Sequence, residues 1–516
     1  MPEEDPRIVE LRELRRKAQL AGGEERIAKH KAKGKLTARE RIEQLLDPDS
    51  FYEIGLYATH RSEDLGMTEK YPGDGVITGY GTVDGRTIYI YAQDFTVMGG
   101  SLGETQGKKI AAIMDMAAAA GAPVIGLIDS GGARINEGVR SLYGYGQIFL
   151  RNAWYSGVIP QISLVLGPCA GGAAYSPAVT DMIIMVEKQS FMFLTGPEVI
   201  KSVTGEVVDT ENLGGADVHL GISGTAHIKT QSDVEAIAMA RRVLSYLPSN
   251  NVENPPFVDT GDDPNRMDDS LNAIVPLDPS EPYNMHEVIE KIVDNGTFIE
   301  LQAPFARNAI VGLARMGGYT VGIVAQEPAF MAGSMDIDSA DKIARFVQFC
   351  DSFNIPLVTF CDSPGFLPGV DQEHRGVIRH GAKVLYSYSN ATVPKIQIIT
   401  RKAYGGAYIV MSSKVMGADI SFAWPSAEIA VMGPEGAANI LYRKQIQEAE
   451  DPAAERKKIV EEYRKKFLNP YAAAADGFVD DVIEPRETRM RVIAALTALR
   501  EKAASTPARK HGNIPL

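Results

Sequence analysis

The feature that most restricts the fold of this 516-residue chain is an internal repeat. The segment Tyr91–Ser101 matches Val324–Ser334 at a shift of 233 positions. Chance does not hold one register over several separate segments, so the repeat predicts two copies of one domain. The same shift aligns Lys109–Ala111 with Lys342–Ala344, Pro123 with Pro356, and Asp129–Gly132 with Asp362–Gly365.

The repeat also sets the expected domain boundaries. One hydrophobic core rarely grows beyond roughly 250 to 300 residues, so a chain of this length is expected to form two large domains. We predict a first domain over residues 1–250, a linker over 251–282 that is rich in Pro, Asn and Asp, and a second domain over 283–516. Small insertions shift the later matches, which pair Pro160 with Pro394, Gly171-Gly172-Ala173 with Gly405-Gly406-Ala407, and Gly196-Pro197-Glu198 with Gly433-Pro434-Glu435.

Short β-branched runs alternate with helical stretches such as Glu104–Ala120, which predicts an α/β fold with a largely parallel sheet in each copy. Residues 7 to about 48 are expected to be helical, with Thr37 as a helix cap and a stop at Asp47-Pro48. The predicted strands include Ile88–Tyr91, Pro123–Asp129, Gln161–Leu166, Pro356–Asp362 and Lys395–Thr400.

Composition and charge exclude several classes of protein. The net charge of −13 argues against nucleic acid as a partner, because phosphate neutralisation drives that binding. The most apolar stretch, Ile110–Ile128, is interrupted by Asp115 and Gly121 and is no membrane span. The acidic start does not resemble a signal peptide, and three irregularly spaced cysteines fit a reducing compartment. We therefore expect a cytoplasmic protein.

The Gly-Gly-Ala segments carry the strongest chemical signal. Each follows a β-rich run, so its glycines allow a tight turn whose backbone N–H groups point into a pocket. Such a turn serves as an oxyanion hole when charge develops in a transition state. The alternative is that the glycines only permit close packing of strand and helix. Because the turn occurs in both copies, we favour a reaction with two developing oxyanions, one per domain.

Other candidate sites are weaker. Gly99–Gly103 fits a hydrolase nucleophile elbow around Ser101, but the second copy loses both outer glycines. Gly103–Lys109 falls one residue short of a P-loop. Cys169 has Ala403 as its counterpart, which argues against a nucleophilic thiol. The eight histidines show no metal-ligand spacing, so no metal is expected. The basic run Lys29–Arg41 is either a solvated helix face or a site for ligand phosphates.

Five motifs bear a close family resemblance from about residue 20 to the terminus. They resemble the β subunits of propionyl-CoA carboxylase and the carboxyltransferase subunit of methylmalonyl-CoA decarboxylase. The motifs are Gly167–Pro177, Asp129–Arg134, Pro364–Gly369, Ile378–Lys383 and Thr400–Tyr408.

This resemblance implies two tandem crotonase-like domains, a homo-hexamer, and transfer of CO2 between biotin on a partner and the α-carbon of an acyl-CoA. It assigns Gly171 and Gly172 to the thioester enolate oxygen, and Gly406 and Ala407 to the ureido oxygen of biotin. The substrate-binding residues that it implies are Ala173, Ser130, Gly131, Gly132, Tyr408 and Ile409. The chain has no Met-Lys-Met biotin-attachment site and no Gly-rich ATP segment, so a biotin carboxylase and a biotin carrier are expected on other chains.

Substrate and direction stay open at this stage. The leading hypothesis is carboxylation of propionyl-CoA, with acetyl-CoA as a further substrate, and the alternative is the reverse transfer in a methylmalonyl-CoA decarboxylase. Ile409 stands where propionyl-type relatives often carry Asp, and it is read either as a determinant of acyl preference or as a core residue of its helix. A non-catalytic scaffold and a serine hydrolase at Ser101 are the remaining alternatives.

Overall fold

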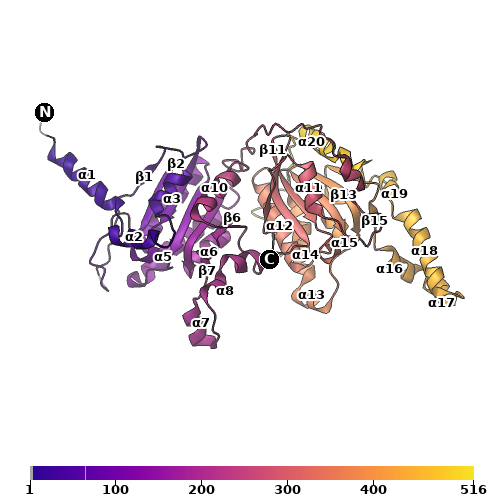
Figure 1. Cartoon of the computed structure of the whole chain (residues 1–516), viewed down its shortest axis with the longest axis horizontal. Coiled ribbons are helices and arrows are strands. Elements are labelled where there is room, and N and C mark those ends of the chain that lie inside the picture. Colours follow the sequence, from indigo (N-terminus) through magenta and orange to yellow (C-terminus); the bar gives the residue numbers. More distant parts are fainter. Residues whose placement is uncertain (1–3, 64) are drawn as a thin grey trace. The chain divides into compact units, whose positions relative to one another are not determined.

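The structure, a computed structural model, describes residues 4–63 and 65–516. It separates into two compact units, Met1–Glu253 and Asn254–Leu516 (Figure 1). Each unit contains one sheet of eight strands with helices packed against it. The duplicated α/β fold predicted from the repeat is thus confirmed. No helix among the described residues is long and apolar enough to cross a membrane.

The sheet of the first unit has the order β1-β2-β3-β4-β5-β6-β8, with β7 paired to β5. β1, β2 and β3 pair antiparallel, and every pairing from β3 onward is parallel. Strands β4 and β6 are buried along their whole length, as expected for a parallel sheet covered on both faces. The strands are β1 (Tyr52–Ile54), β2 (Val76–Val83), β3 (Arg86–Gln93), β4 (Val124–Ser130), β5 (Gln161–Ala170), β6 (Met182–Val186), β7 (Phe191–Phe193) and β8 (Ile228–Thr230).

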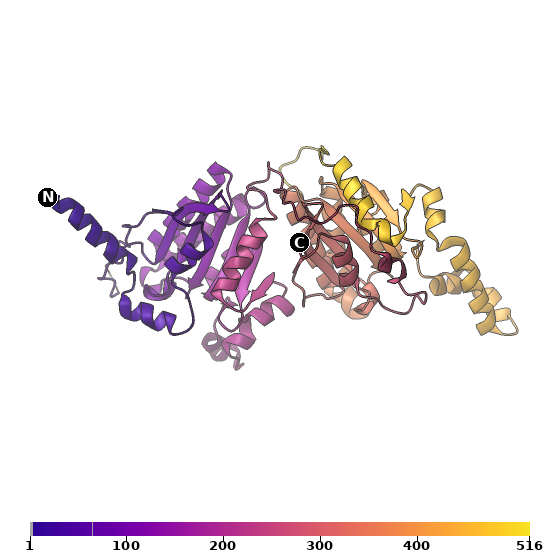
Figure 2. The ribbon, with the colours of Figure 1, turned by 45° about the horizontal axis from the view of Figure 1, so that its top comes forward.

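Helices cover both faces of this sheet (Figure 2). Tyr89 and Tyr91 join the core formed with α4 and α5, whereas the alternate residues Ile88 and Ile90 point to the face covered by α3 and α10. The helices are α1 (Pro6–Gln19), α2 (Glu24–Lys31), α3 (Ala38–Leu45), α4 (Glu104–Ala120), α5 (Val139–Trp154), α6 (Gly172–Val179), α7 (Pro197–Thr204), α8 (Thr210–Gly214), α9 (Ala216–Gly221) and α10 (Asp233–Leu244), with 3-10 turns η1 (Met98–Gly100) and η2 (Ile135–Glu137).

The second unit repeats this plan. Its sheet runs β16-β14-β13-β12-β11-β10-β9, with β15 paired to β13, and only β9, β10 and β11 pair antiparallel. The strands are β9 (Ile299–Leu301), β10 (Ala309–Met316), β11 (Tyr319–Gln326), β12 (Leu357–Ser363), β13 (Lys395–Tyr404), β14 (Ile420–Ala423), β15 (Glu428–Ala430) and β16 (Asp481–Val482).

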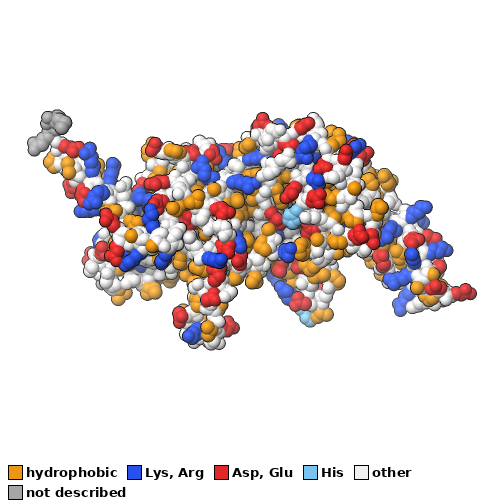
Figure 3. Space-filling model, in the orientation of Figure 1, with side chains coloured by type: hydrophobic (Ala, Val, Ile, Leu, Met, Phe, Trp, Pro, Cys, Tyr) orange, Lys and Arg blue, Asp and Glu red, His pale blue; other side chains and the backbone are white. Residues whose placement is uncertain are grey.

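Helices α11 and α20 contribute to the core on one face of the second sheet, and α12 and α14 pack on each other. Helix α18 buries only Ile459, and its surface is dominated by charged side chains (Figure 3). The helices are α11 (Met285–Ile292), α12 (Ile337–Ser352), α13 (Val370–Arg375), α14 (Val377–Asn390), α15 (Gly405–Val410), α16 (Pro434–Leu441), α17 (Arg443–Glu448), α18 (Pro452–Phe467), α19 (Pro470–Ala475) and α20 (Thr488–Ala498), with 3-10 turns η3 (Asp269–Ala273), η4 (Met331–Gly333), η5 (Lys414–Met416) and η6 (Pro485–Glu487).

The local predictions agree well with these elements. The hydroxyl of Thr37 accepts from the Glu40 N–H at 3.2 Å, and the Glu40 carboxylate accepts from the Thr37 N–H at 2.9 Å, which confirms the predicted cap of α3. Helix α4 covers the predicted range Glu104–Ala120 and ends at Gly121, whose φ of 62° lies in the left-handed region that glycine adopts readily. All five predicted strands are present.

The segment 251–282, expected as a linker, packs on the second unit from Asn254 onward. The Val258 N–H donates to the Gly318 carbonyl at 3.0 Å, and Leu271 is buried in the core of this unit. The Pro, Asn and Asp residues of the segment 251–282 therefore belong to irregular backbone that packs against the neighbouring sheet.

Candidate functional site

The first Gly-Gly-Ala turn lies where β5 ends and α6 begins. Gly171 has φ 59° and ψ −125°, a conformation that side-chain-bearing residues rarely adopt. Its N–H donates to the Phe193 carbonyl at 2.9 Å. The N–H groups of Gly172 and Ala173 belong to the first turn of α6, where a helix offers no carbonyl to its own donors. These two amides can therefore meet an oxyanion.

The predicted loop Ser130-Gly131-Gly132 packs against this turn. Gly132 has φ 99°, and a Cβ added to it would lie 2.7 Å from the Ala170 carbonyl oxygen. The Gly131 N–H donates to the Gly99 carbonyl at 2.9 Å, and the Gly132 N–H donates to the Ser130 hydroxyl at 3.2 Å. The structure thus brings the predicted residues 130–132 and 171–173 together at the carboxyl ends of neighbouring parallel strands, where ligands bind in open α/β sheets.

The second turn has the same construction at the end of β13. Gly405 has φ 57°, and Gly406 and Ala407 occupy the next two positions of α15. The Phe366 ring lies near Gly406, since a Cβ there would be 3.9 Å from Phe366 Cε2. Ala407 is fully buried, so its side chain fixes the turn while its N–H lies in the first turn of the helix.

Tyr408 and Ile409 differ in their environments. Tyr408 is buried, its hydroxyl has no hydrogen-bond partner in the described parts of the chain, and burial raises its pKa to about 12. Ile409 is 41% exposed. The reading of Ile409 as a core residue of its helix is therefore wrong, because in an amphipathic turn that contains Ala407, Tyr408 and Val410 it is the side chain that faces outward.

A polar anchor beside the second turn was not predicted from the sequence. The Tyr404 hydroxyl donates to the Glu428 carboxylate across the paired strands β13 and β15. The Arg464 guanidinium of α18 lies 3.2 Å from the same carboxylate. Tyr404 immediately precedes Gly405, and its counterpart in the first unit is Ala170. Only a comparison of the two copies at this position could have drawn attention to it.

The rejected nucleophiles have structural roles. Burial raises the pKa of the Cys169 thiol well above its usual range, and the thiol donates to the Ala173 carbonyl at 3.1 Å. The Ser101 hydroxyl donates to the Met98 carbonyl of its own turn at 2.7 Å. A Cβ on Gly100 would lie 2.1 Å from the Asp129 carbonyl oxygen, so this glycine permits close backbone packing. Among the described residues, neither side chain has the activating partner that a nucleophile requires.

The basic run Lys29–Arg41 divides into three groups, of which one, Lys31 and Arg39, pairs with the carboxylates of Glu40 and Glu53. Lys35 and Arg41 are buried and contact the Asp129 carboxylate at 2.6 and 3.0 Å. Lys29 and Lys33 instead line a cavity of about 330 Å³ beside α2, together with Arg26, His30, Tyr71, Phe95, Thr96, Met98 and Gly99. Arg26 lies outside the predicted run and was missed. Within residues 4–63 and 65–516, no group of three or more His, Cys, Asp or Glu is arranged to hold a metal ion.

Known proteins share this architecture over the full chain. Residues 29–514 match the carboxyl transferase domain family. The chain is 58% identical to the propionyl-CoA carboxylase carboxyltransferase subunit of Haloferax mediterranei and 55% identical to the methylmalonyl-CoA decarboxylase subunit alpha of Propionigenium modestum, covering 99% of each protein and of itself. A crystal structure of transcarboxylase 12S, described as a hexamer assembly with methylmalonyl-CoA bound, superposes with a TM-score of 0.97 at 51% identity and covers 100% of this chain and 99% of that one.

The duplicated crotonase-like sheets and their glycine turns, taken with these matches, define an acyl-CoA carboxyltransferase. The chain belongs to the carboxyl transferase family and is of the propionyl-CoA carboxylase β type.

Proposed function

We propose that this chain transfers CO2 from carboxybiotin, carried on a partner protein, to the α-carbon of propionyl-CoA, with acetyl-CoA as a further substrate. The observation that carries the proposal is the pair of equivalent turns, each ending a central parallel strand and each presenting first-turn amides. Two charge-accepting turns suit a transfer in which a thioester enolate and a ureido oxygen both gain negative charge.

The first turn is proposed to serve the acyl-CoA. Because the Gly171 N–H is bonded to Phe193, the donors to an enolate oxygen are assigned to Gly172 and Ala173, one residue further along than the sequence suggested. The counterparts of these two residues in the repeat are Gly406 and Ala407, which are proposed to hold the ureido oxygen of biotin. The two halves of the site then use equivalent positions.

The basic cavity supports the same assignment. Arg26, Lys29 and Lys33 line it, as does Gly99, whose carbonyl accepts from Gly131 beside the first turn. A phosphate-bearing tail bound to these cations could extend from the cavity toward Gly172 along the glycine-rich loops. Lysine and arginine are the usual partners of phosphate groups.

The chain's own residues act by position and electrostatics. Bound biotin supplies the carboxyl group and a basic ureido nitrogen for the α-proton, so the turns need only hold the two oxygens and orient the reacting atoms. No side-chain base is assigned. By resemblance to the transcarboxylase 12S structure, the proposed assembly is a hexamer. Because the sequence has no Met-Lys-Met site and no Gly-rich ATP segment, we propose that the biotin carboxylase and the biotin carrier are on other chains.

The reverse transfer is the second candidate, because the chain is nearly as similar to a methylmalonyl-CoA decarboxylase subunit as to a propionyl-CoA carboxylase subunit. The two are separated by two assays. The first supplies propionyl-CoA, a biotin carboxylase with its carrier, ATP and labelled bicarbonate, and the second supplies methylmalonyl-CoA, the biotin carrier and a membrane decarboxylase subunit. Labelled methylmalonyl-CoA in the first assay supports carboxylation. If the first assay gives no product and the second gives propionyl-CoA, decarboxylation is supported.

The division between the turns is tested by removing single N–H groups. Ala173→Pro and Ala407→Pro delete one first-turn donor each, at positions where a helix tolerates proline. Each is expected to lower kcat by about 10²-fold or more. The matched controls Ala173→Gly and Ala407→Gly keep the N–H. Unchanged transfer in both proline variants, with the hexamer intact, would favour a non-catalytic scaffold.

A further inference from the structure

A second cavity lies in the second unit, away from the glycine turn. Its volume is about 660 Å³, within the range of small-molecule sites. Pro356 and Pro394, which line it, precede the amino ends of β12 and β13, whereas Gly405 follows the carboxyl end of β13. Since β13 has ten residues, it separates the two places by about 30 Å. The cavity is therefore not a subsite of the reaction.

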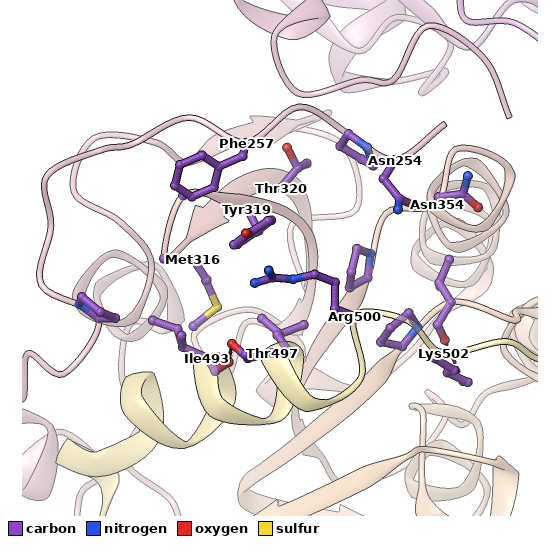
Figure 4. A pocket seen from close by; sticks show the side chains of 18 of the residues that line it. Asn254, Phe257, Met316, Tyr319, Thr320, Asn354, Ile493, Thr497, Arg500 and Lys502 are labelled. Atoms are coloured by element: carbon purple, nitrogen blue, oxygen red, sulfur yellow. Dashed lines mark hydrogen bonds between the residues drawn. The ribbon is translucent and has the colours of Figure 1, made fainter. Parts of the chain in front are cut away.

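The centre of this cavity is an arginine stacked on an aromatic ring. Arg500 points into the middle of the pocket in Figure 4, and its guanidinium carbon lies 3.8 Å from the centre of the Tyr319 ring. The Phe257 ring packs on Tyr319 with 4.8 Å between centroids. Met316 and Ile493 add an apolar wall beside them. A guanidinium fixed on an aromatic face keeps its N–H groups available to an anion.

The other charged side chains that line the cavity mostly have partners within the protein. Lys502 lies 2.8 Å from the Asp419 carboxylate, and Asp262 lies 2.9 Å from the Arg266 guanidinium. Asp259 is exposed and accepts the Gly261 N–H at 2.9 Å. Arg500 has no carboxylate partner in the described parts of the chain. Its charge is the one that a ligand in this cavity would neutralise.

The first unit fills the corresponding place with its own chain. There Arg86 takes the position of Tyr319 in the repeat, and its guanidinium donates to the Leu247 carbonyl at 2.7 Å. Tyr246 and Leu247, which follow the last helix α10, are 4% and 0% exposed. The segment that follows α20 in the second unit, by contrast, presents Arg500 and Lys502 and leaves the cavity open. The space is thus specific to the second copy and is not required by the fold.

We infer that this cavity is a second ligand site, which takes a small organic anion with a planar apolar body. The anionic group would pair with the Arg500 guanidinium, and the planar body would lie on Met316, Ile493 and the aromatic pair Tyr319 and Phe257. The proposal of this second ligand site holds whichever acyl-CoA the protein carboxylates.

The test compares two probes of the same shape in the assembled full-length protein, naphthalene-2-carboxylate and its neutral carboxamide, by calorimetry and ligand-observed NMR. The carboxylate is expected to bind at least 10-fold more tightly than the carboxamide. Arg500→Gln should reduce carboxylate binding about 10-fold and leave carboxamide binding unchanged, while Arg500→Lys restores part of the loss. The matched control, Arg491→Gln on the preceding helix α20, should change neither.

A second variant tests the cavity itself. Thr497→Trp places an indole in the space and should weaken the binding of both probes by more than 10-fold, with its folding checked by the thermal unfolding midpoint. The proposal is overturned if the wild type binds neither probe at millimolar concentration, if the two probes bind equally, or if Arg500→Gln leaves carboxylate binding unchanged. Because Arg500 is exposed, Arg500→Gln is expected to fold. Its effect on carboxylate binding is therefore sufficient by itself to test the proposal.

Discussion

The Arg41 guanidinium donates to the Asp129 carboxylate at 3.0 Å, and both side chains are at most 1% exposed. Asp129 is the second-to-last residue of β4, beside the first glycine turn, and Asp362 is its counterpart in the second unit. There the partner is Arg401, also at 3.0 Å, which comes from the adjacent strand β13. The N-terminal helices of the first unit thus supply a charge that the second unit carries within its own sheet.

This relationship predicts a large loss of stability in Arg41→Met. Asp129 keeps its contact with Lys35 at 2.6 Å, but Arg41 also contacts the buried Asp233 carboxylate at 2.8 Å. Removing Arg41 takes the cation from that second buried carboxylate, which typically costs about 3–5 kcal/mol. Arg39→Met is the matched control, because the Arg39–Glu53 pair is partly exposed and should contribute about 1 kcal/mol or less. Urea unfolding of both variants measures the difference. Equal losses would show that the buried contacts of Arg41 stabilise the fold no more than the partly exposed pair does.

The pH dependence of stability is predicted to include a contribution from His286. The Glu300 and Glu327 carboxylates lie 2.9 and 3.2 Å from its ring nitrogens and raise its pKa from 6.5 to about 9. A raised folded-state pKa gives stability that is fully present below pH 6.5 and is lost as the pH rises through 9.

In His286→Gln the loss of stability with rising pH that His286 causes should disappear. The unfolding midpoint of the variant should therefore fall less steeply between pH 6.5 and 9 than that of the wild type. The ring is about one-third exposed, so solvent screening limits the effect to about 1 kcal/mol. The exposed His511, changed to Gln, serves as the control. Parallel pH profiles for the wild type and His286→Gln would contradict the prediction.

The sequence predicted the fold and the turns because both depend on local signals that occur twice. The Thr37 cap, the helix end at Gly121 and the repeated Gly-Gly-Ala turns could all be read from spacing. The anchor of Tyr404 on Glu428 could not, since it joins residues from two strands and exists in one copy only. Likewise, the bonded N–H of Gly171 is set by the Phe193 carbonyl on a neighbouring strand, so tertiary contact moved the proposed donors by one residue.

Tyr404→Phe is predicted to weaken the biotin half of the proposed site. The variant loses a hydrogen bond to a carboxylate that also contacts Arg464, and such bonds contribute about 1.5–3 kcal/mol. Because Tyr404 directly precedes Gly405, part of this loss should appear as a shift of the second turn. We expect kcat/KM for the biotin-bearing donor to fall about 10-fold and the KM for acyl-CoA to stay unchanged. The exposed Tyr471→Phe is the control, and an equal rise in both KM values would argue against a role specific to this turn.

The final prediction concerns acyl preference and the side chain of Ile409. This residue is exposed beside the second turn, so Ile409→Asp should change the free energy of unfolding by no more than about 0.5 kcal/mol. Ile409 lies beside the turn proposed for biotin, and its interpretation as a determinant of acyl preference requires its side chain to reach the acyl group across the site. On that interpretation a carboxylate at this position changes the polarity that the acyl group meets. The ratio of kcat/KM for propionyl-CoA to that for acetyl-CoA should then shift, which paired assays of labelled bicarbonate incorporation would measure. Val415→Asp, another exposed apolar position in this unit, is the control for a general effect of added charge. A ratio that is unchanged in Ile409→Asp would remove this side chain from the acyl site, while the assignment of the backbone amides at Gly406 and Ala407 would stand independently.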